Sequence, residues 1–161
     1  MQLVGPNGDQ FRLRIVGYQF PSKVDDEYDS NWLRVEIQAT VRGRSWQSID
    51  ACLLTWELTS LIDWIEHIAA GKNADREVRF LEPNLSFTLN QKQGDRVCFS
   101  VFFELESRPS WASAKGAPES DLWAELECSS RELQAWSAEL REQLKKFPVR
   151  AGVSNSEGKK N

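Results

Sequence analysis

Apolar and polar residues alternate along much of the first fifty positions, which is the pattern of β-strands that bury one face. Strands are expected at residues 1–4 and 11–16, joined by the turn residues 5–8 with the sequence Gly-Pro-Asn-Gly. A longer alternating run covers residues 32–41, and a glycine then marks the turn into a shorter strand at residues 45–49. The first third of the chain is therefore predicted to be an antiparallel meander.

The period changes in the next segment. Leucine and isoleucine recur at intervals of three and four between residues 58 and 69, which predicts an amphipathic helix. Thr55 is expected to cap the N-terminus of this helix and Gly71 to end it. Trp56 and Trp64 fall toward the flanks of the apolar stripe, so we expect both at the edge of the core.

Short alternating segments then return. Strands are expected at residues 77–81, 85–89, 97–106 and 122–128. The third of these strands has apolar side chains on both faces for much of its length, Leu105 included, which favours a central position in the sheet. Residues 107–119 contain two prolines, a glycine and many small side chains, so this segment is predicted to be a loop.

A second helix closes the pattern. Ser129 and Glu132 have the spacing of a capping box, and Pro148 is expected to end the helix. Strands and helices do not alternate, so the fold class is α+β: a mostly antiparallel sheet of about seven to eight strands with one mid-chain and one C-terminal helix. We expect one domain over residues 1–148 and a disordered C-terminal tail over residues 149–161.

Charge narrows the choice of partners. The 161 residues carry a formal net charge of −4, and since the tail contributes +2, residues 1–148 carry −6. Such a body suits a basic protein partner rather than nucleic acid, although acidity alone also serves solubility. No apolar run approaches the length of about 20 residues that spans a bilayer, and no signal peptide is visible. A cytoplasmic protein without membrane association is expected.

The residues that usually carry catalysis are sparse. Cys52, Cys98 and Cys128 have no metal-site spacing and are expected to be reduced and buried. His67, the single histidine, falls on the polar flank of the first helix, where we expect it to be solvated. Because no phosphate-binding loop or nucleophile elbow is present, we expect no enzyme activity, metal or cofactor. A carboxylate-based hydrolase and a carboxylate-only metal site stay open as alternatives.

One stretch concentrates negative charge. Its residues are Asp25, Asp26, Glu27, Tyr28 and Asp29. A solvated loop, a weak calcium loop and a docking surface for a basic partner are the three interpretations, and calcium is disfavoured because the spacing is not that of an EF-hand. Exposed tryptophans beside acidic residues are typical of protein-binding hot spots, and Trp111 and Trp123 are the candidates for exposure. The docking surface is therefore expected in residues 23–29 or in residues 108–119, with Tyr28 or Trp111 as its aromatic anchor.

Four strings in a fixed order resemble a known family. They are Gly17-Tyr18-Gln19-Phe20-Pro21, Asp29-Ser30-Asn31-Trp32-Leu33, Cys52-Leu53-Leu54-Thr55 with Glu57-Leu58, and Glu82-Pro83-Asn84-Leu85-Ser86-Phe87. Together they resemble the WapI-type immunity protein family, which is associated with bacterial polymorphic toxin systems. The resemblance implies a non-enzymatic cytoplasmic protein that binds and neutralises a cognate toxin, which in the type system is a nuclease acting on transfer RNA. It carries over no catalytic residues.

The motif residues are expected to be mainly structural. Asn31 and Asn84 are expected to close turns by hydrogen bonds to the backbone, and Phe20, Trp32 and Phe87 to share one core. Pro21 and Pro83 are expected to fix φ at strand ends, and the other motif residues are Gly17, Tyr18 and Glu82. An immunity protein that occludes a basic nuclease is the leading hypothesis. A protein-binding scaffold domain with no toxin link is the alternative, and the oligomeric state is left open.

Overall fold

The computed structural model describes residues 1–112 and 121–150, and this part of the chain forms two four-stranded antiparallel sheets and two long helices. Sheet A consists of β1 (Leu3–Val4), β2 (Gln10–Tyr18), β3 (Trp32–Val41) and β4 (Arg44–Leu54) in that order. Sheet B consists of β5 (Glu77–Arg79), β6 (Leu85–Gln93), β7 (Arg96–Phe103) and β8 (Trp123–Ser129). The predicted α+β class is confirmed, whereas the division of the strands into two sheets was not predicted.

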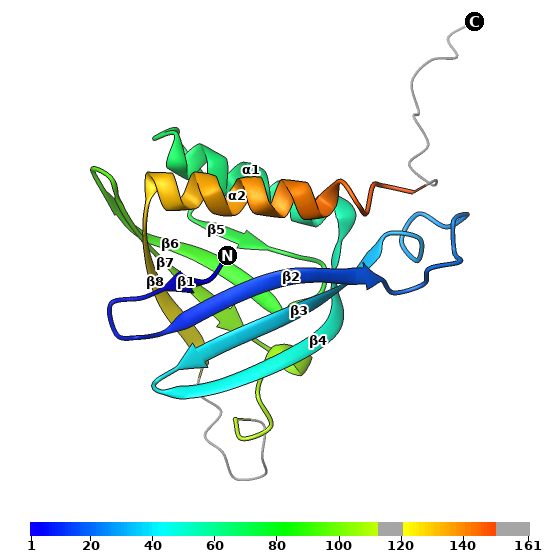
Figure 1. The fold of residues 1–161 in the computed structure, drawn as a ribbon, viewed down its shortest axis with the longest axis horizontal. Coiled ribbons are helices and arrows are strands. Elements are labelled where there is room, and N and C mark those ends of the chain that lie inside the picture. Colours follow the sequence, from blue (N-terminus) through cyan, green and yellow to red (C-terminus); the bar gives the residue numbers. More distant parts are fainter. Residues whose placement is uncertain (113–120, 151–161) are drawn as a thin grey trace, which may run out of the picture.

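The two sheets face one another, and the helices α1 (Thr55–Ala69) and α2 (Ser130–Leu144) lie side by side across one end of the space between them (Figure 1). Alternate residues of each strand fill this space with one continuous hydrophobic core. Phe11 of sheet A meets Phe87 of sheet B edge-on at a ring distance of 5.9 Å, and Trp136 of α2 packs against both. The apolar stripes that predicted the strands and helices thus meet in a single core.

Several strands end at positions that differ from the prediction; β6, for example, was expected to end at residue 89 and continues to Gln93. β4 continues beyond residue 49 to Leu54, because a bulge between Ala51 and Leu53 keeps the strand paired with β3 while it enters the core. β7 ends at Phe103, and the chain turns into a short 3-10 helix, η1 (Leu105–Ser107). Leu105 was expected on the buried face, which is wrong: its φ is +47° and its side chain is 54% exposed.

Helix α1 begins one residue earlier than expected. Thr55 is its first helical residue, so the predicted Thr55 cap is wrong; Leu54 occupies the cap position, and its N–H donates to Glu57 Oε2 at 2.9 Å. The predicted stop at Gly71 is confirmed by a φ of +70° and by an N–H that donates to Ile68 O at 3.0 Å. Trp64 is buried rather than at the core edge, and its indole N–H donates to a backbone carbonyl at 2.7 Å.

Helix α2 has the predicted capping box. The N–H of Glu132 donates to Ser129 Oγ at 3.2 Å, and the N–H of Ser129 donates to Glu132 Oε2 at 2.7 Å. The helix ends at Leu144, before Pro148 is reached. Within the described residues, neither helix is long and apolar enough to cross a membrane.

Candidate functional site

The acidic residues singled out in the sequence lie on the loop between β2 and β3, which projects from one end of the molecule (Figure 1). All five side chains from Asp25 to Asp29 are exposed. Asp26 differs from its neighbours because its Oδ1 accepts the N–H groups of Tyr28 and Asp29 at 2.9 and 2.8 Å. This carboxylate therefore shapes the loop, and the other acidic side chains are presented to solvent around it.

Asn31 fastens the end of this loop to the body. Its side-chain NH₂ donates to Glu27 O at 2.7 Å, and its Oδ1 accepts the hydroxyl of Thr55 at 3.1 Å. The backbone carbonyl of Asn31 also accepts the N–H of Thr55 at 3.1 Å. The prediction that Asn31 closes a turn by a side-chain to backbone hydrogen bond is confirmed, and the same residue also joins the loop to the start of α1.

The chain beyond α2 holds the other side of the loop. Arg150 donates through Nη1 to three carbonyls of the loop, those of Phe20, Pro21 and Lys23, at 3.1, 2.9 and 3.0 Å. Its guanidinium carbon lies 3.4 Å from the centre of the Tyr18 ring. Arg150 falls within the tail that was expected from residue 149 onward, but it is an anchor of the loop. Residues 151–161 of that tail, and residues 113–120 of the loop predicted at 107–119, lie outside the described part of the chain.

The structure separates the two aromatic anchors that the sequence suggested. Tyr28 is 49% exposed and packs edge-on against Trp56 of α1 at 5.8 Å. Trp111 is half-buried against Trp46, with the Arg44 guanidinium 3.9 Å from its ring centre. Trp46, the neighbour of Trp111, lies eight residues before Leu54 at the end of β4, a distance of about 26 Å along the strand. Trp56, the neighbour of Tyr28, follows just after that end. In Figure 1 the chain that follows η1 accordingly lies well away from the acidic loop.

The remaining motif residues divide between core and surface. Phe87 is fully buried and Trp32 half-buried, but Phe20 is 44% exposed, so the expectation of one shared core fails for Phe20. Asn84 is buried, yet its side chain donates to two carboxylates rather than to the backbone. The turn role predicted for the Asn84 side chain is therefore wrong; its backbone carbonyl instead accepts the N–H of Glu104 at 3.0 Å.

A second acidic group escaped the sequence analysis. Four carboxylates from four separate segments, those of Asp50, Glu57, Glu82 and Glu106, act on the thiol of Cys52 through their charge. Burial raises the pKa of Cys52 strongly, and these negative charges raise it further. Asn84 holds two of them, because its NH₂ donates to Asp50 Oδ2 and Glu106 Oε2 at 3.2 Å each. No sequence spacing relates these residues, so only the fold could reveal them.

The three thiols have no reactive setting in the structure. Cys52 and Cys128 are buried as predicted, whereas Cys98 is only half-buried, and all three are free. Burial raises the pKa of Cys128 to about 12 and also raises the pKa of Cys98. A thiolate is therefore disfavoured at each of these positions.

His67 is exposed near the end of α1 and borders an open groove with Ser60, Asp63 and Asp75. No hydrogen bond in the described structure connects the imidazole to the hydroxyl or to either carboxylate, so the groove does not assemble a nucleophile and its base. No group of three or more potential metal ligands gathers within the described residues.

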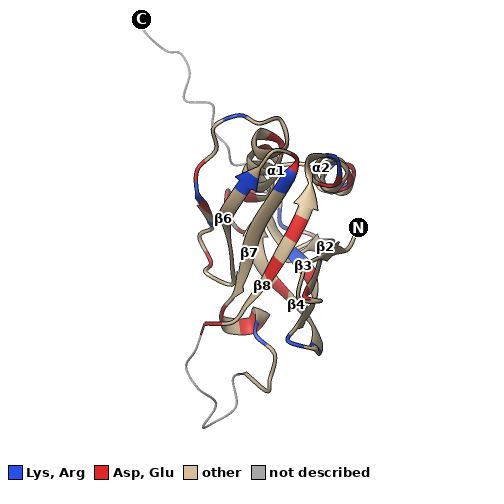
Figure 2. Ribbon diagram, turned by 90° about the vertical axis from the view of Figure 1, so that its left-hand side faces the viewer, with Lys and Arg blue, Asp and Glu red and all other residues tan. Residues whose placement is uncertain are grey.

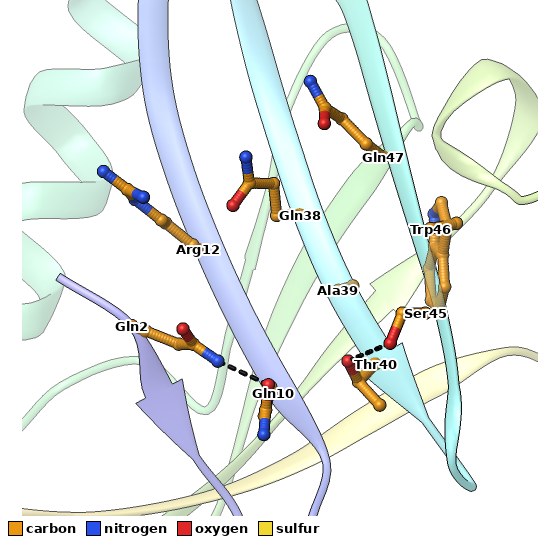
Figure 3. A pocket seen from close by; sticks show the side chains of 9 residues that line it. All are labelled: Gln2, Gln10, Arg12, Gln38, Ala39, Thr40, Ser45, Trp46 and Gln47. Atoms are coloured by element: carbon orange, nitrogen blue, oxygen red, sulfur yellow. Dashed lines mark hydrogen bonds between the residues drawn. The ribbon is translucent and has the colours of Figure 1, made fainter.

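The outer face of sheet A carries a shallow depression of about 540 Å³ lined largely by amide and hydroxyl side chains (Figure 3). Thr40 and Ser45 pair near the hairpin end of β3 and β4 and share a hydrogen bond at 2.8 Å, and Gln38 and Gln47 pair two residues further along the same strands (Figure 3). Neutral amides and hydroxyls offer hydrogen bonds but no acid–base pair or nucleophile with a base. The outer face of sheet B differs, since β8 presents Glu125 and Glu127 as acidic bands beside the basic ends of β6 and β7 (Figure 2).

Comparison with known proteins gives the family. The family model described as immunity protein WapI-like family matches residues 2–148, which is nearly the whole chain and includes all four strings that carried the resemblance. No curated protein and no solved structure matches the chain. This protein therefore belongs to the WapI-like immunity protein family, in which a toxin-neutralising role is the function that membership suggests.

Proposed function

We propose that the protein is a non-enzymatic immunity protein of a bacterial polymorphic toxin system that binds a nuclease toxin in the cytoplasm and blocks it. Family membership supports the toxin-neutralising role. The docking surface is the acidic loop, defined as Asp25, Asp26, Glu27, Tyr28 and Asp29. Tyr28 serves as its aromatic anchor.

The observation that carries this proposal is a loop that is at once acidic, exposed and firmly held. The carboxylates of Glu27 and Asp29 have no hydrogen-bond or ion-pair partner in the described structure, and Asp25 has only an exposed contact with Lys23 at 3.5 Å. Asn31 and Arg150 hold the two sides of the loop from within the same molecule. A loop that is ordered before binding loses less conformational entropy in the complex, which favours affinity.

The charge of the loop fits a nuclease. A protein that cleaves a nucleic acid must attract phosphate groups, so its active site and substrate groove carry cationic side chains. An acidic loop complements such a groove, speeds the encounter and occupies the place of the phosphates. Tyr28, which is 49% exposed and packed against Trp56, adds an amphipathic contact with few rotatable bonds.

Coexpression tests the proposed function directly. The toxin domain encoded by the gene immediately upstream is expressed in a heterologous bacterium with or without this protein, and cell survival and transfer RNA integrity are measured. Survival and intact transfer RNA only in the presence of the protein are expected. Continued killing despite soluble expression of both proteins would contradict neutralisation of that toxin and favour a scaffold function.

A binding experiment then separates charge from other contacts. The tagged protein is used to capture the purified toxin domain at low and at high salt. We expect capture that weakens as salt rises, because exposed charge pairs are screened. Capture that is indifferent to salt would contradict the role of the acidic loop while leaving neutralisation itself in place.

A further inference from the structure

The sheet edges of the described structure are protected very unevenly. An exposed edge is a template for strand pairing, so natural proteins shorten, charge or cover it. β1 has two residues and β5 has three, which leaves little edge to pair. β8 is covered by the turn before β2: Glu125 donates its N–H to Asp9 Oδ2 at 3.0 Å, and a Cβ on Gly5 would lie 1.7 Å from Glu125 O. The fourth edge, β4, has eleven residues.

Within the described residues, the β4 edge has backbone groups without partners. β3 and β4 are joined by the two-residue turn Arg42-Gly43, in which both residues have positive φ, and Val41 pairs with Arg44. In a hairpin of this kind the pair next to the turn exchanges both hydrogen bonds, and bonded pairs then alternate. The N–H and C=O groups of Ser45, Gln47 and Ile49 therefore point away from β3, and no residue of the described structure pairs with them.

This free edge is complementary to itself. If a second copy of β4 lies antiparallel with Gln47 opposite the Gln47 of that copy, Ser45 faces Ile49 in both directions. The three outward-pointing residues of each copy then form the hydrogen-bonded pairs of the new ladder, as an antiparallel sheet requires. Arg44 falls opposite Asp50 at both ends in the same register. The alternation of the backbone and the sequence of charges thus select one register.

We infer that two copies of the chain associate through antiparallel pairing of their β4 edges, which joins the two A sheets into one eight-stranded sheet with its twofold axis at Gln47. Asp50 can accept a hydrogen bond from Arg44 of the second copy through Oδ1, because Asn84 donates only to its Oδ2. Arg44 presents the face of its guanidinium to Trp111, which leaves the N–H groups at its rim for a carboxylate. Gln47 and Ser45 belong to the depression of Figure 3, which would continue across the axis into the second copy.

Charge identifies the occupant of the edge as a second copy rather than a strand of the basic toxin. The hairpin end of β4 is basic, with exposed Arg42 and Arg44, and the opposite end is acidic, with Asp50 beside Glu106. Antiparallel self-pairing sets each basic end against an acidic end. A uniformly basic strand would be repelled at one end of this edge. The inference is independent of toxin binding, because the acidic loop is a separate segment between β2 and β3.

Cysteine substitution tests the register. At the twofold axis two Gln47 Cα atoms would lie about 5.5 Å apart, within disulfide range, whereas two Ser45 Cα atoms would lie about 14 Å apart. Under mild oxidation we expect Gln47→Cys to form a covalent dimer and Ser45→Cys to remain uncrosslinked, like the wild type with its three native thiols. Equal crosslinking of the two variants, or none for Gln47→Cys, would overturn the proposed pairing.

Proline substitution tests the edge itself. Proline is tolerated at an edge position whose N–H faces solvent, so Gln47→Pro should fold but should not pair. Gln47→Ala is the matched control, because both variants lose the hydrogen bond that Gln47 donates to Glu36 at 2.6 Å. By light scattering at increasing protein concentration we expect twice the 18.5 kDa chain mass for wild type and Gln47→Ala, and a single chain mass for Gln47→Pro. A wild type that stays at one chain mass, or a Gln47→Pro variant that dimerises like it, would overturn the inference.

Discussion

At the scale of single residues, Asn31 shows how one buried amide organises a functional loop. It is fully buried, and it bonds to the loop, to the start of α1 and to the backbone of Arg150. Asn31→Ala would leave these buried groups without partners, so we expect a loss of about 3 kcal/mol in the free energy of unfolding. Urea denaturation measures this loss. The exposed Asn73→Ala is the control, and equal midpoints for the two variants would contradict the assigned role.

Leu105 allows a separate prediction about backbone strain. Its φ of +47° is unfavourable for a leucine, whereas glycine adopts such angles freely. Leu105→Gly and Leu105→Ala both remove a largely exposed side chain, but only the glycine variant relieves the strain. We expect the glycine variant to be more stable than the alanine variant by about 1 kcal/mol, measured by chemical denaturation. An alanine variant that is equally stable would show that this backbone conformation is not strained.

At the scale of elements, one side chain joins the two helices. Arg141 of α2 donates through Nε and Nη2 to the two carboxylate oxygens of Glu66 on α1, both at 2.7 Å, and through Nη2 to Asp63 at 2.9 Å. The hydrogen bonds from Arg141 lower the pKa of Glu66 below its usual range. Because the pKa of Glu66 is lower in the folded state, the interaction of Glu66 with Arg141 stabilises the protein fully above the unfolded-state pKa. This stabilisation is lost as the pH falls through the folded-state pKa.

The lowered pKa of Glu66 predicts how the contribution of the Arg141–Glu66 ion pair depends on pH. Arg141→Met keeps much of the stem but removes the charge, so we expect it to destabilise the protein at pH 7. Glu66 is more than a third exposed, and screening therefore limits the effect to at most about 1 kcal/mol. Below the acidic pKa of Glu66 the difference between variant and wild type should shrink. Denaturation curves at pH 7 and pH 3 measure it, and a difference that does not depend on pH would indicate lost packing instead.

Elements were predictable from sequence where the pattern was local. β3 spans the residues that alternation predicted, and the capping box of Ser129 and Glu132 is present. The errors occur where tertiary contacts override a local preference. Thr55 resembles a cap, but its hydroxyl bonds to Asn31, which is 24 residues away in the sequence. β4 extends beyond the alternating segment that predicted it, because a bulge lets its last residues stay paired with β3 while they enter the core. Such a bulge has no sequence signal of its own.

At the scale of the whole molecule, only part of the proposed site was accessible from sequence. The acidic loop was visible because its charges are contiguous, whereas Asp50, Glu57, Glu82 and Glu106 come to act on Cys52 only after folding. Arg150 was assigned to a tail, since nothing local shows that it returns to the loop. Tyr28 and Trp111 were alternative aromatic anchors in the sequence, and the fold places them in different regions. Docking and self-association are accordingly proposed for different parts of the surface.

The affinity of a loop variant for the toxin domain tests the central claim most directly. Asp25, Glu27 and Asp29 are changed together to lysine, and Asp26 is kept because it shapes the loop. The control carries the same change in net charge at exposed acidic residues elsewhere, Asp75→Lys, Asp121→Lys and Glu142→Lys. We predict that the loop variant folds, binds the toxin domain at least about tenfold more weakly and loses most of the salt dependence, whereas the control changes little. Equal affinities for the loop variant and the control would contradict docking through the acidic loop.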